Sequence, residues 1–258
     1  MNRINQLFET KKNEILSVYF TAGYPALNDT LPILRVLQSE SVNMVEIGIP
    51  FSDPMADGQV IQESSAAALR NGMTLSLLFD QLRTVREEIS IPLILMGYLN
   101  PIMQFGFENF CRCCSEIGID GVIVPDLPFR DYTERYKEIA ERYDIKVIML
   151  ITPETSEERV RLIDENTDGF IYMVSSAATT GAQQSFGDEK HAYFRRIRDM
   201  HLKNPLMIGF GISNKVTFDA VLQYASGAIV GSRFVSLLAE SKEIKKATKQ
   251  LIEILRSE

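Results

Sequence analysis

Apolar residues gather in eight short runs along the chain, each rich in Val, Ile, Met and Phe. The runs begin at Leu16, Met44, Pro92, Gly121, Lys146, Phe170, Leu206 and Gly227. Within each run the apolar residues are continuous and do not alternate with polar ones. Continuous runs of this kind are typical of parallel strands that are covered on both faces. The pattern therefore predicts eight buried parallel strands.

Charged stretches with helical spacing of their apolar positions separate these runs. Examples are LSLLFDQLRTVREEI before the third run, YTERYKEIAERY after the fourth and EERVRLIDEN after the fifth. We expect Thr155 to mark one helix start, and Ser213 to precede another helix that begins at Asn214, because hydroxyl side chains cap exposed N–H groups. Strand and helix thus alternate, as in a parallel sheet with right-handed crossovers.

Eight strand–helix units favour an α/β fold of the closed (β/α)8 type, the TIM barrel, over an open doubly wound sheet. The string GFGISN also lacks the third glycine of the Rossmann fingerprint. Ile4, Leu7 and Phe8 share one helical face, so we expect an extra N-terminal helix that covers the bottom of the barrel. No linker or low-complexity tract divides the chain, and its 258 residues suit one barrel domain over 1–258.

Charge and hydropathy narrow the range of partners. Lys and Arg number 27 against 34 Asp and Glu, so the net charge of −7 lacks the basic footprint that nucleic acid binding needs. No apolar run approaches the roughly 20 residues of a membrane span, and the first residues lack the apolar core of a signal peptide. We therefore expect a cytoplasmic protein that binds neither nucleic acid nor a membrane.

The side chains at the carboxyl ends of the strands, where barrels of this kind hold their active sites, exclude several chemistries. No lysine projects from a strand end, since Lys146 opens the fifth strand and Lys215 starts a helix, and this disfavours a Schiff base. No His or Cys lies there either, which disfavours zinc and thiol catalysis. The three cysteines lie together between 111 and 114, without a second group of ligands, and indicate free thiols in a reducing compartment. We expect no metal.

Carboxylates remain as candidate catalysts. Glu46 lies inside the apolar run MVEIGIP, where burial would raise its pKa and make it a proton carrier near neutral pH. The alternative is a glutamate held in a buried ion pair or by backbone donors. Asp53 and Asp57, taken alone, are ordinary turn residues, and Tyr172 in the sixth run is more simply a core aromatic.

Two glycine-rich loops predict a phosphate site. GFGIS follows the seventh run, where backbone amides near Gly209 and Gly211 could approach an anion, and GSRF places Gly231 and Ser232 at a helix N-terminus. Free N–H groups and the helix dipole favour negative charge there. The alternative is that these glycines only make tight turns.

Several strings of the sequence also occur together in one known family. These are FTAGYP, VEIGIPFSDPMADGQVIQ, GVIVPDLP, FIYMV followed by TTGA, GFGIS and GAIVGS, in this order. Along essentially the whole chain they resemble the tryptophan synthase alpha subunit family, and EIGIPFSDPMADG is the most specific of them. The resemblance implies a lyase of L-tryptophan biosynthesis. It would split indole-3-glycerol phosphate into indole and glyceraldehyde 3-phosphate by a retro-aldol reaction without a metal or a Schiff base.

The resemblance also implies a role for each site residue. Glu46 would shuttle protons, Asp57 would stabilise charge at the indole N–H, and Tyr172 would line the site beside the glutamate. The implied substrate-binding residues are Tyr19, Ile61 and Ile123 around the indole, Thr180 in the sixth loop, and Gly181, Phe210, Gly211, Gly231 and Ser232 around the phosphate.

By the same resemblance, the chain would pair with a beta subunit in an alpha2beta2 tetramer. The implied contacts come from Asp53, Pro54, Asn100 and Pro101, and the loop after the sixth strand would close over the substrate. Pyridoxal phosphate belongs to the beta subunit, so we expect no cofactor in this chain.

The sequence departs from the family pattern at Ser176, Ala178 and Tyr19, where arginine, glycine and phenylalanine are expected. Two other functions stay open. One is a stand-alone indole-3-glycerol phosphate lyase, and the other is a non-catalytic regulatory barrel, against which Glu46 and Asp57 argue.

Overall fold

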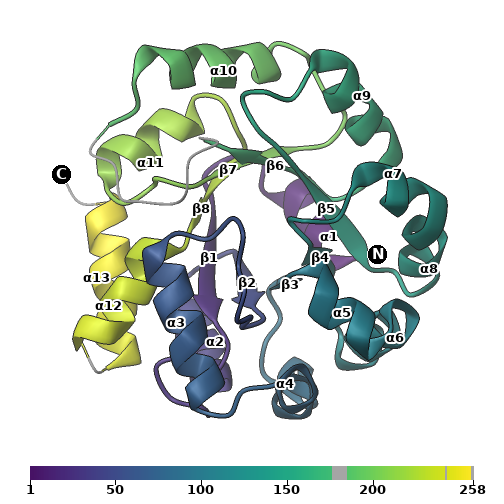
Figure 1. Ribbon diagram of the computed structural model, residues 1–258. Helices are drawn as coiled ribbons and strands as arrows, with labels where there is room; N and C mark the ends of the chain where they lie inside the picture. Colours follow the sequence, from purple (N-terminus) through teal and green to yellow (C-terminus); the bar gives the residue numbers. More distant parts are fainter. Residues whose placement is uncertain (176–184, 242, 257–258) are drawn as a thin grey trace.

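Eight parallel strands close into a barrel in the computed structural model of the chain (Figure 1). The structure describes residues 1–175, 185–241 and 243–256. Each strand pairs with the next, and the last pairs with the first, for example Ser17 with Ile229. The strands are β1 (Ile15–Thr21), β2 (Met44–Gly48), β3 (Leu93–Met96), β4 (Gly121–Ile123), β5 (Lys146–Ile151), β6 (Ile171–Val174), β7 (Leu206–Gly209) and β8 (Gly227–Val230). The predicted (β/α)8 barrel is confirmed.

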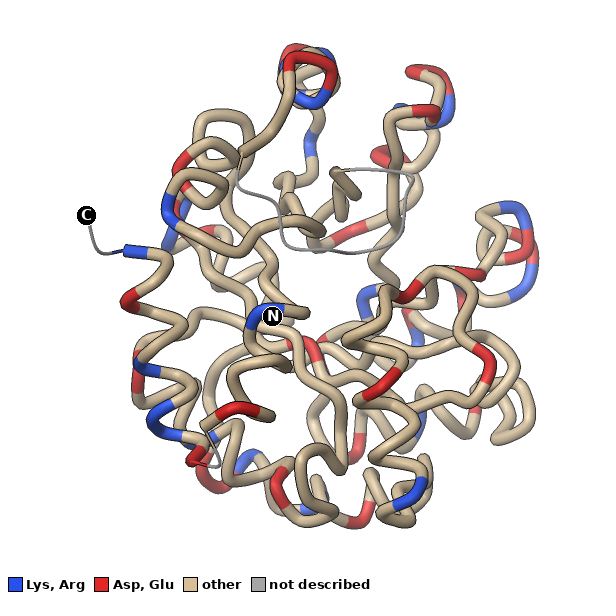
Figure 2. Tube along the Cα trace, turned by 60° about the vertical axis from the view of Figure 1, so that its left-hand side comes forward, with Lys and Arg blue, Asp and Glu red and all other residues tan. Residues whose placement is uncertain are grey.

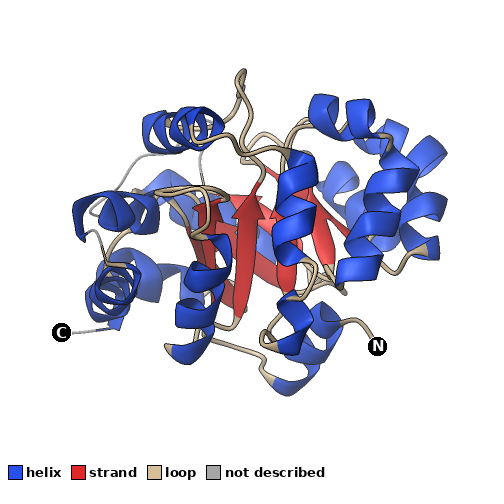
Figure 3. Cartoon of the chain, turned by 90° about the horizontal axis from the view of Figure 1, so that it is seen from below, coloured by secondary structure: helices blue, strands red, loops and turns tan. Residues whose placement is uncertain are grey.

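Helices surround the barrel on its outside, and most cross from the carboxyl end of one strand to the start of the next (Figures 1 and 3). They are α1 (Arg3–Thr10), α2 (Thr30–Ser39), α3 (Gln59–Arg70), α4 (Leu75–Leu82), η1 (Val85–Glu87), α5 (Leu99–Phe105), α6 (Phe107–Ile117), α7 (Phe129–Asp131), the π-helical η2 (Tyr132–Tyr136), α8 (Lys137–Arg142), α9 (Glu157–Asn166), α10 (Asp188–Arg198), α11 (Lys215–Leu222), α12 (Ser232–Ser241) and α13 (Ile244–Arg256).

Two predicted helix starts are wrong by one residue. Ser156, not Thr155, caps α9 by accepting a hydrogen bond from the N–H of Arg159 at 3.3 Å. The Thr155 hydroxyl instead accepts from the N–H of Thr152, which closes the turn before the helix. Likewise α11 begins one residue later than expected, because the side chain of Asn214 caps it.

The predicted N-terminal helix is confirmed and lies at the amino end of the barrel. Ile4 and Phe8 of α1 are buried in the same apolar cluster as the side chains that fill the barrel interior. The ring centroids of Phe8 and Phe170 are 5.8 Å apart, and Phe170 directly precedes β6. The helix therefore covers the end of the barrel at which the strands begin.

A buried carboxylate, Asp120, connects α1 to the strands at this amino end. It is 2% exposed and stands just before β4. Its carboxylate pairs with Arg3 at 3.0 Å and with Arg86 at 2.5 Å, and it accepts the N–H of Leu93 at 2.8 Å. One side chain thus joins α1, η1 and the start of β3.

Acidic and basic residues are interspersed over the outer helices (Figure 2). No helix among the described residues is long and apolar enough to cross a membrane. Those residues also contain no group of three or more His, Cys, Asp or Glu side chains that could hold a metal ion. The cysteines are free thiols on α6, as expected, and Cys111 and Cys114 are buried.

Candidate active site

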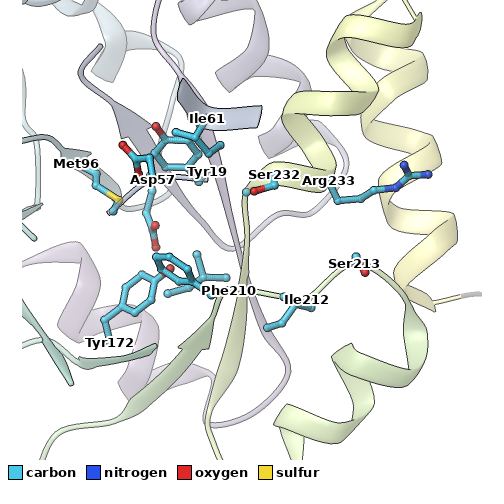
Figure 4. Close-up of a pocket in the computed structure, with 14 residues that line it drawn as sticks. Tyr19, Asp57, Ile61, Met96, Tyr172, Phe210, Ile212, Ser213, Ser232 and Arg233 are labelled. Atoms are coloured by element: carbon cyan, nitrogen blue, oxygen red, sulfur yellow. The ribbon is translucent and has the colours of Figure 1, made fainter. Parts of the chain in front are cut away.

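A pocket opens at the carboxyl end of the barrel (Figure 4). Most of the described residues that line it come from β1, β2, β3, β6 and the loops after β2, β7 and β8. They are Tyr19, Glu46, Asp57, Ile61, Met96, Tyr172, Phe210, Gly211, Ile212, Ser213, Ile229, Gly231, Ser232 and Arg233. All three predicted catalytic residues therefore border one cavity, together with six of the nine predicted substrate-binding residues.

Glu46 is the most unusual group in this pocket. Its side chain is fully buried, and the hydroxyl of Ser17 donates a hydrogen bond to Oε1 at 3.1 Å. The other oxygen, Oε2, has no hydrogen-bond partner within the described part of the chain, and no ion pair is formed there. Burial raises the pKa of Glu46 to about 8, although the Ser17 hydrogen bond opposes the shift. The carboxyl group is therefore mostly protonated at neutral pH and can donate a proton.

The raised pKa predicts a stability that falls as the pH rises. Because the folded pKa of about 8 exceeds the usual value of 4.5, the folded state holds this proton more tightly. The contribution of Glu46 to the free energy of unfolding is fully present below pH 4.5 and is lost as the pH rises through about 8. Relative to Glu46→Gln, the parent should lose free energy of unfolding between these values. Urea unfolding of both proteins at several pH values measures this, and a difference independent of pH would contradict it.

Two tyrosines flank Glu46, and each depends on a glycine. Tyr19 lies opposite Glu46 in the β1–β2 register. A Cβ added at Gly48 would lie 2.1 Å from the Tyr19 hydroxyl, and one at Gly209 would lie 2.2 Å from the Tyr172 hydroxyl. Gly48 and Gly209 therefore make room for the two phenols. Gly209, expected to let amides approach an anion, belongs to β7 and faces Tyr172.

Asp57 is held by a residue that the sequence analysis does not identify. The hydroxyl of Tyr98 donates to Asp57 Oδ2 at 2.9 Å and accepts from the N–H of Ala56 at 3.1 Å. Burial raises the pKa of Asp57, and the Tyr98 hydrogen bond counteracts this. Because Tyr98 is the last residue of the third predicted strand, PLILMGY, the rule that strand ends carry the site could have found it.

The apolar part of the pocket differs in part from the prediction. Ile61 lies beside Tyr19 in a small buried cluster, with Met96 packed against it. Ile123, by contrast, is fully buried in the barrel interior and is not among the residues that line the pocket. Met96 and Ile229 line it without having been predicted. Both belong to continuous apolar runs in which the sequence does not mark the pocket-facing residue.

The other end of the pocket consists of backbone. Phe210 and Gly211 both have positive φ angles, +70° and +79°, an unusual conformation for a phenylalanine. The hydroxyl of Ser175 donates to the carbonyl oxygen of Phe210 at 2.6 Å and supports this turn. The first hydrogen bond of α12 runs from the N–H of Val235 to the carbonyl of Gly231. The N–H groups between them therefore have no acceptor within the helix, and Gly231 has no side chain to cap them.

The predicted sixth-loop residues Thr180 and Gly181 lie outside the described residues, as do Ser176 and Ala178. Of the four predicted partner contacts, Asp53 and Pro54 lie in the loop after β2, whereas Asn100 and Pro101 lie in the first turn of α5, which follows β3. Asp53 and Asn100 are exposed there, and Pro54 and Pro101 are partly exposed. A contact between the rings of Phe51 and Tyr98, with centroids 5.4 Å apart, joins the loop after β2 to the start of α5.

Comparisons with known proteins agree with one another. A family model described as "Tryptophan synthase alpha chain" matches residues 5–258. The chain is 68% identical to the tryptophan synthase alpha chain of Bacteroides thetaiotaomicron, over 99% of this chain and 100% of that protein. It is 56% identical to that of Flavobacterium johnsoniae, over 93% of this chain and 95% of that one.

Solved structures show the same relationship. The tryptophan synthase subunit alpha of Legionella pneumophila superposes with a TM-score of 0.89 at 32% identity, covering 99% of this chain and 97% of that one. A chain of the tryptophan synthase complex of Pyrococcus furiosus gives a TM-score of 0.85 at 36% identity, covering 95% and 98%. The chain therefore belongs to the tryptophan synthase alpha chain family.

Proposed function

We propose that this chain, a lyase of tryptophan synthesis, cleaves indole-3-glycerol phosphate to indole and glyceraldehyde 3-phosphate. The observation that carries the proposal is Glu46, a fully buried carboxyl group with one unpaired oxygen beside the pocket. Aromatic and aliphatic side chains line one end of this pocket, and free helical N–H groups lie at the other. An indole ring suits the first end, and a phosphate group suits the second.

The two carboxyl groups supply the chemistry that the reaction needs. Breaking the C–C bond requires an electron sink, and the indole ring becomes one when its C3 atom is protonated. Protonated Glu46 donates that proton, and Asp57 stabilises the positive charge that develops at the ring N–H. Glu46 then accepts the proton of the glycerol hydroxyl. The C–C bond breaks, its electron pair restores the aromatic ring, and the carboxyl group ends as it began.

Tyr98 acts as a positioning residue in this scheme, because its hydroxyl holds Asp57 on one side and the N–H of Ala56 on the other. Tyr98→Phe removes both hydrogen bonds and keeps the ring contact with Phe51. We expect a loss in kcat of about 10-fold, the value of one hydrogen bond to a charged group. Steady-state kinetics of indole release measures it. Tyr136→Phe, which removes a partly exposed phenol that donates to the sulfur of Met103, is the control, and equal kinetics of the two variants would contradict the role.

We further propose a beta subunit as the partner, in an alpha2beta2 tetramer, with pyridoxal phosphate held by that subunit. Support comes from the names of the relatives, which are alpha chains, and from the Pyrococcus furiosus structure, which is of a tryptophan synthase complex. The loop with Asp53 and Pro54 and the first turn of α5, with Asn100 and Pro101, would form the contact.

An assay of indole formation, with and without added beta subunit, tests the proposed function. Slow release by the isolated chain and strong activation by the beta subunit are expected. Rapid release that the beta subunit does not change would instead indicate a stand-alone lyase. Binding of substrate without any release of indole, even with the beta subunit, would indicate a regulatory barrel and reject the proposal.

A further inference from the structure

The pocket has a marked polarity along its length. Asp57 and Tyr19, the residue opposite Glu46 in the β1–β2 register, lie at one end, and Ser213, Ser232 and Arg233 lie on the far side (Figure 4). Arg233 is the one lysine or arginine among the described residues that line the cavity. A single cation thus stands at the end opposite the two carboxyl groups.

Arg233 occupies an electrostatically unfavourable position in the protein without a ligand. It is the second residue of α12, where the positive end of the helix dipole repels a cation. The first turn of α12 contains no acidic residue, and no ion pair or hydrogen bond of the Arg233 side chain is found within the described residues. An anion bound at the start of α12 would be attracted both by the positive end of the helix dipole and by the charge of Arg233.

The geometry leaves the guanidinium group able to reach such an anion. Arg233 is partly exposed, and its side chain leaves the helix on the side where Ser213 lies, away from Asp57 and Tyr172 (Figure 4). Ser232, the first residue of α12, lies between Arg233 and Tyr19 (Figure 4). A guanidinium group offers paired donors that match the oxygens of a phosphate.

We propose that Arg233 binds the phosphate group of the substrate and adds a cation to the backbone donors at the start of α12. The assignment rests on the proposed function, because that function places a phosphate at this end of the pocket. It extends the function by naming a side chain that selects a doubly charged phosphate ester over an uncharged indole derivative.

Calorimetric titration with inorganic phosphate, and separately with indole, tests the role of Arg233. The variants are Arg233→Gln, Arg233→Lys and, as a matched control, Arg70→Gln, which removes an exposed charge at the last turn of α3. We expect Arg233→Gln to raise the dissociation constant of phosphate by about 10-fold or more, as for the loss of a charge-assisted hydrogen bond. Arg233→Lys should lie between parent and Arg233→Gln. Indole binding should change in neither, and Arg70→Gln should bind phosphate like the parent.

Steady-state kinetics gives a second readout, in which KM should rise more than kcat falls, as expected for a group that binds the ground state and the transition state alike. Equal phosphate affinity in Arg233→Gln and Arg70→Gln would overturn the assignment, even in an active enzyme. Equal weakening of phosphate and indole would also overturn it, since it would indicate a distorted pocket. Phosphate binding that depends on Arg233, in a chain that releases no indole, would reject the reaction and support the role of Arg233.

Discussion

Glu46→Gln is expected to lower kcat for indole formation by about 10²- to 10⁴-fold, the usual contribution of one positioned proton donor. The amide keeps the shape of the carboxyl group and can accept the hydrogen bond that Ser17 donates at 3.1 Å. It cannot give a proton to the indole ring or take one from the glycerol hydroxyl. The dissociation constant of inorganic phosphate should stay close to that of the parent, because Glu46 lies away from the start of α12. Initial rates of indole release and phosphate titrations measure the two quantities.

Glu63→Gln provides a matched control for this substitution. Glu63 is an exposed residue of α3 whose carboxylate accepts a hydrogen bond from Gln59. The control makes the same chemical change on the surface, and its turnover should equal that of the parent. Turnover of Glu46→Gln at the parental rate would exclude Glu46 as the proton carrier. A loss of phosphate binding equal to the loss of kcat would instead indicate a collapsed pocket.

Asp120→Ala is expected to lower the free energy of unfolding by about 3–5 kcal/mol, the usual effect of breaking a buried ion pair by removing one partner. The substitution leaves Arg86, whose side chain is 16% exposed, without its carboxylate, and it also frees Arg3 and the N–H of Leu93. Three elements at the amino end of the barrel thereby lose their common partner. Urea unfolding followed by circular dichroism measures the change.

Asp80→Ala is the control for Asp120→Ala. Asp80 pairs with Arg83 on the surface of α4, where the two side chains are 61% and 76% exposed, and such pairs contribute little. Its unfolding midpoint should therefore remain close to that of the parent. If the two alanine variants unfolded at the same urea concentration, the buried carboxylate would not have the stabilising role assigned to it.

The barrel can be predicted from the sequence because parallel strands covered on both faces need apolar residues at every position. Even β4, with three residues, lies within a predicted run. The starts of α9 and α11 cannot be predicted as well. Thr155 and Ser156 are both hydroxyl residues, and only the path of the backbone decides which side chain faces the free N–H groups.

Some residues of the site can be predicted from the sequence and others cannot. Glu46 is recognisable because a carboxyl group inside an apolar run has few explanations apart from chemistry. Asp57 cannot be recognised as a site residue in this way, because ADG is an ordinary turn string. Its hydrogen-bond partner, Tyr98, follows 41 residues later in the chain. Gly48 escapes notice for a similar reason. This position must be glycine only because the ring of Tyr19, on the neighbouring strand, fills the space that a Cβ atom would occupy.

The position of α1 has a consequence for the order of events during synthesis of the chain. The helix is made before the strands that it covers, and the side chain of Asn2 donates to the carbonyl oxygens of Asp120 and Asp144, which follow 118 and 142 residues later. At about 5–20 residues per second, the second of these is made roughly 7–28 s after Asn2. During that interval the apolar face of Ile4 and Phe8 has no binding site in the barrel. Helix α1 thus reaches its final place long after it is made, and a chaperone that covered this face would protect the growing chain from aggregation.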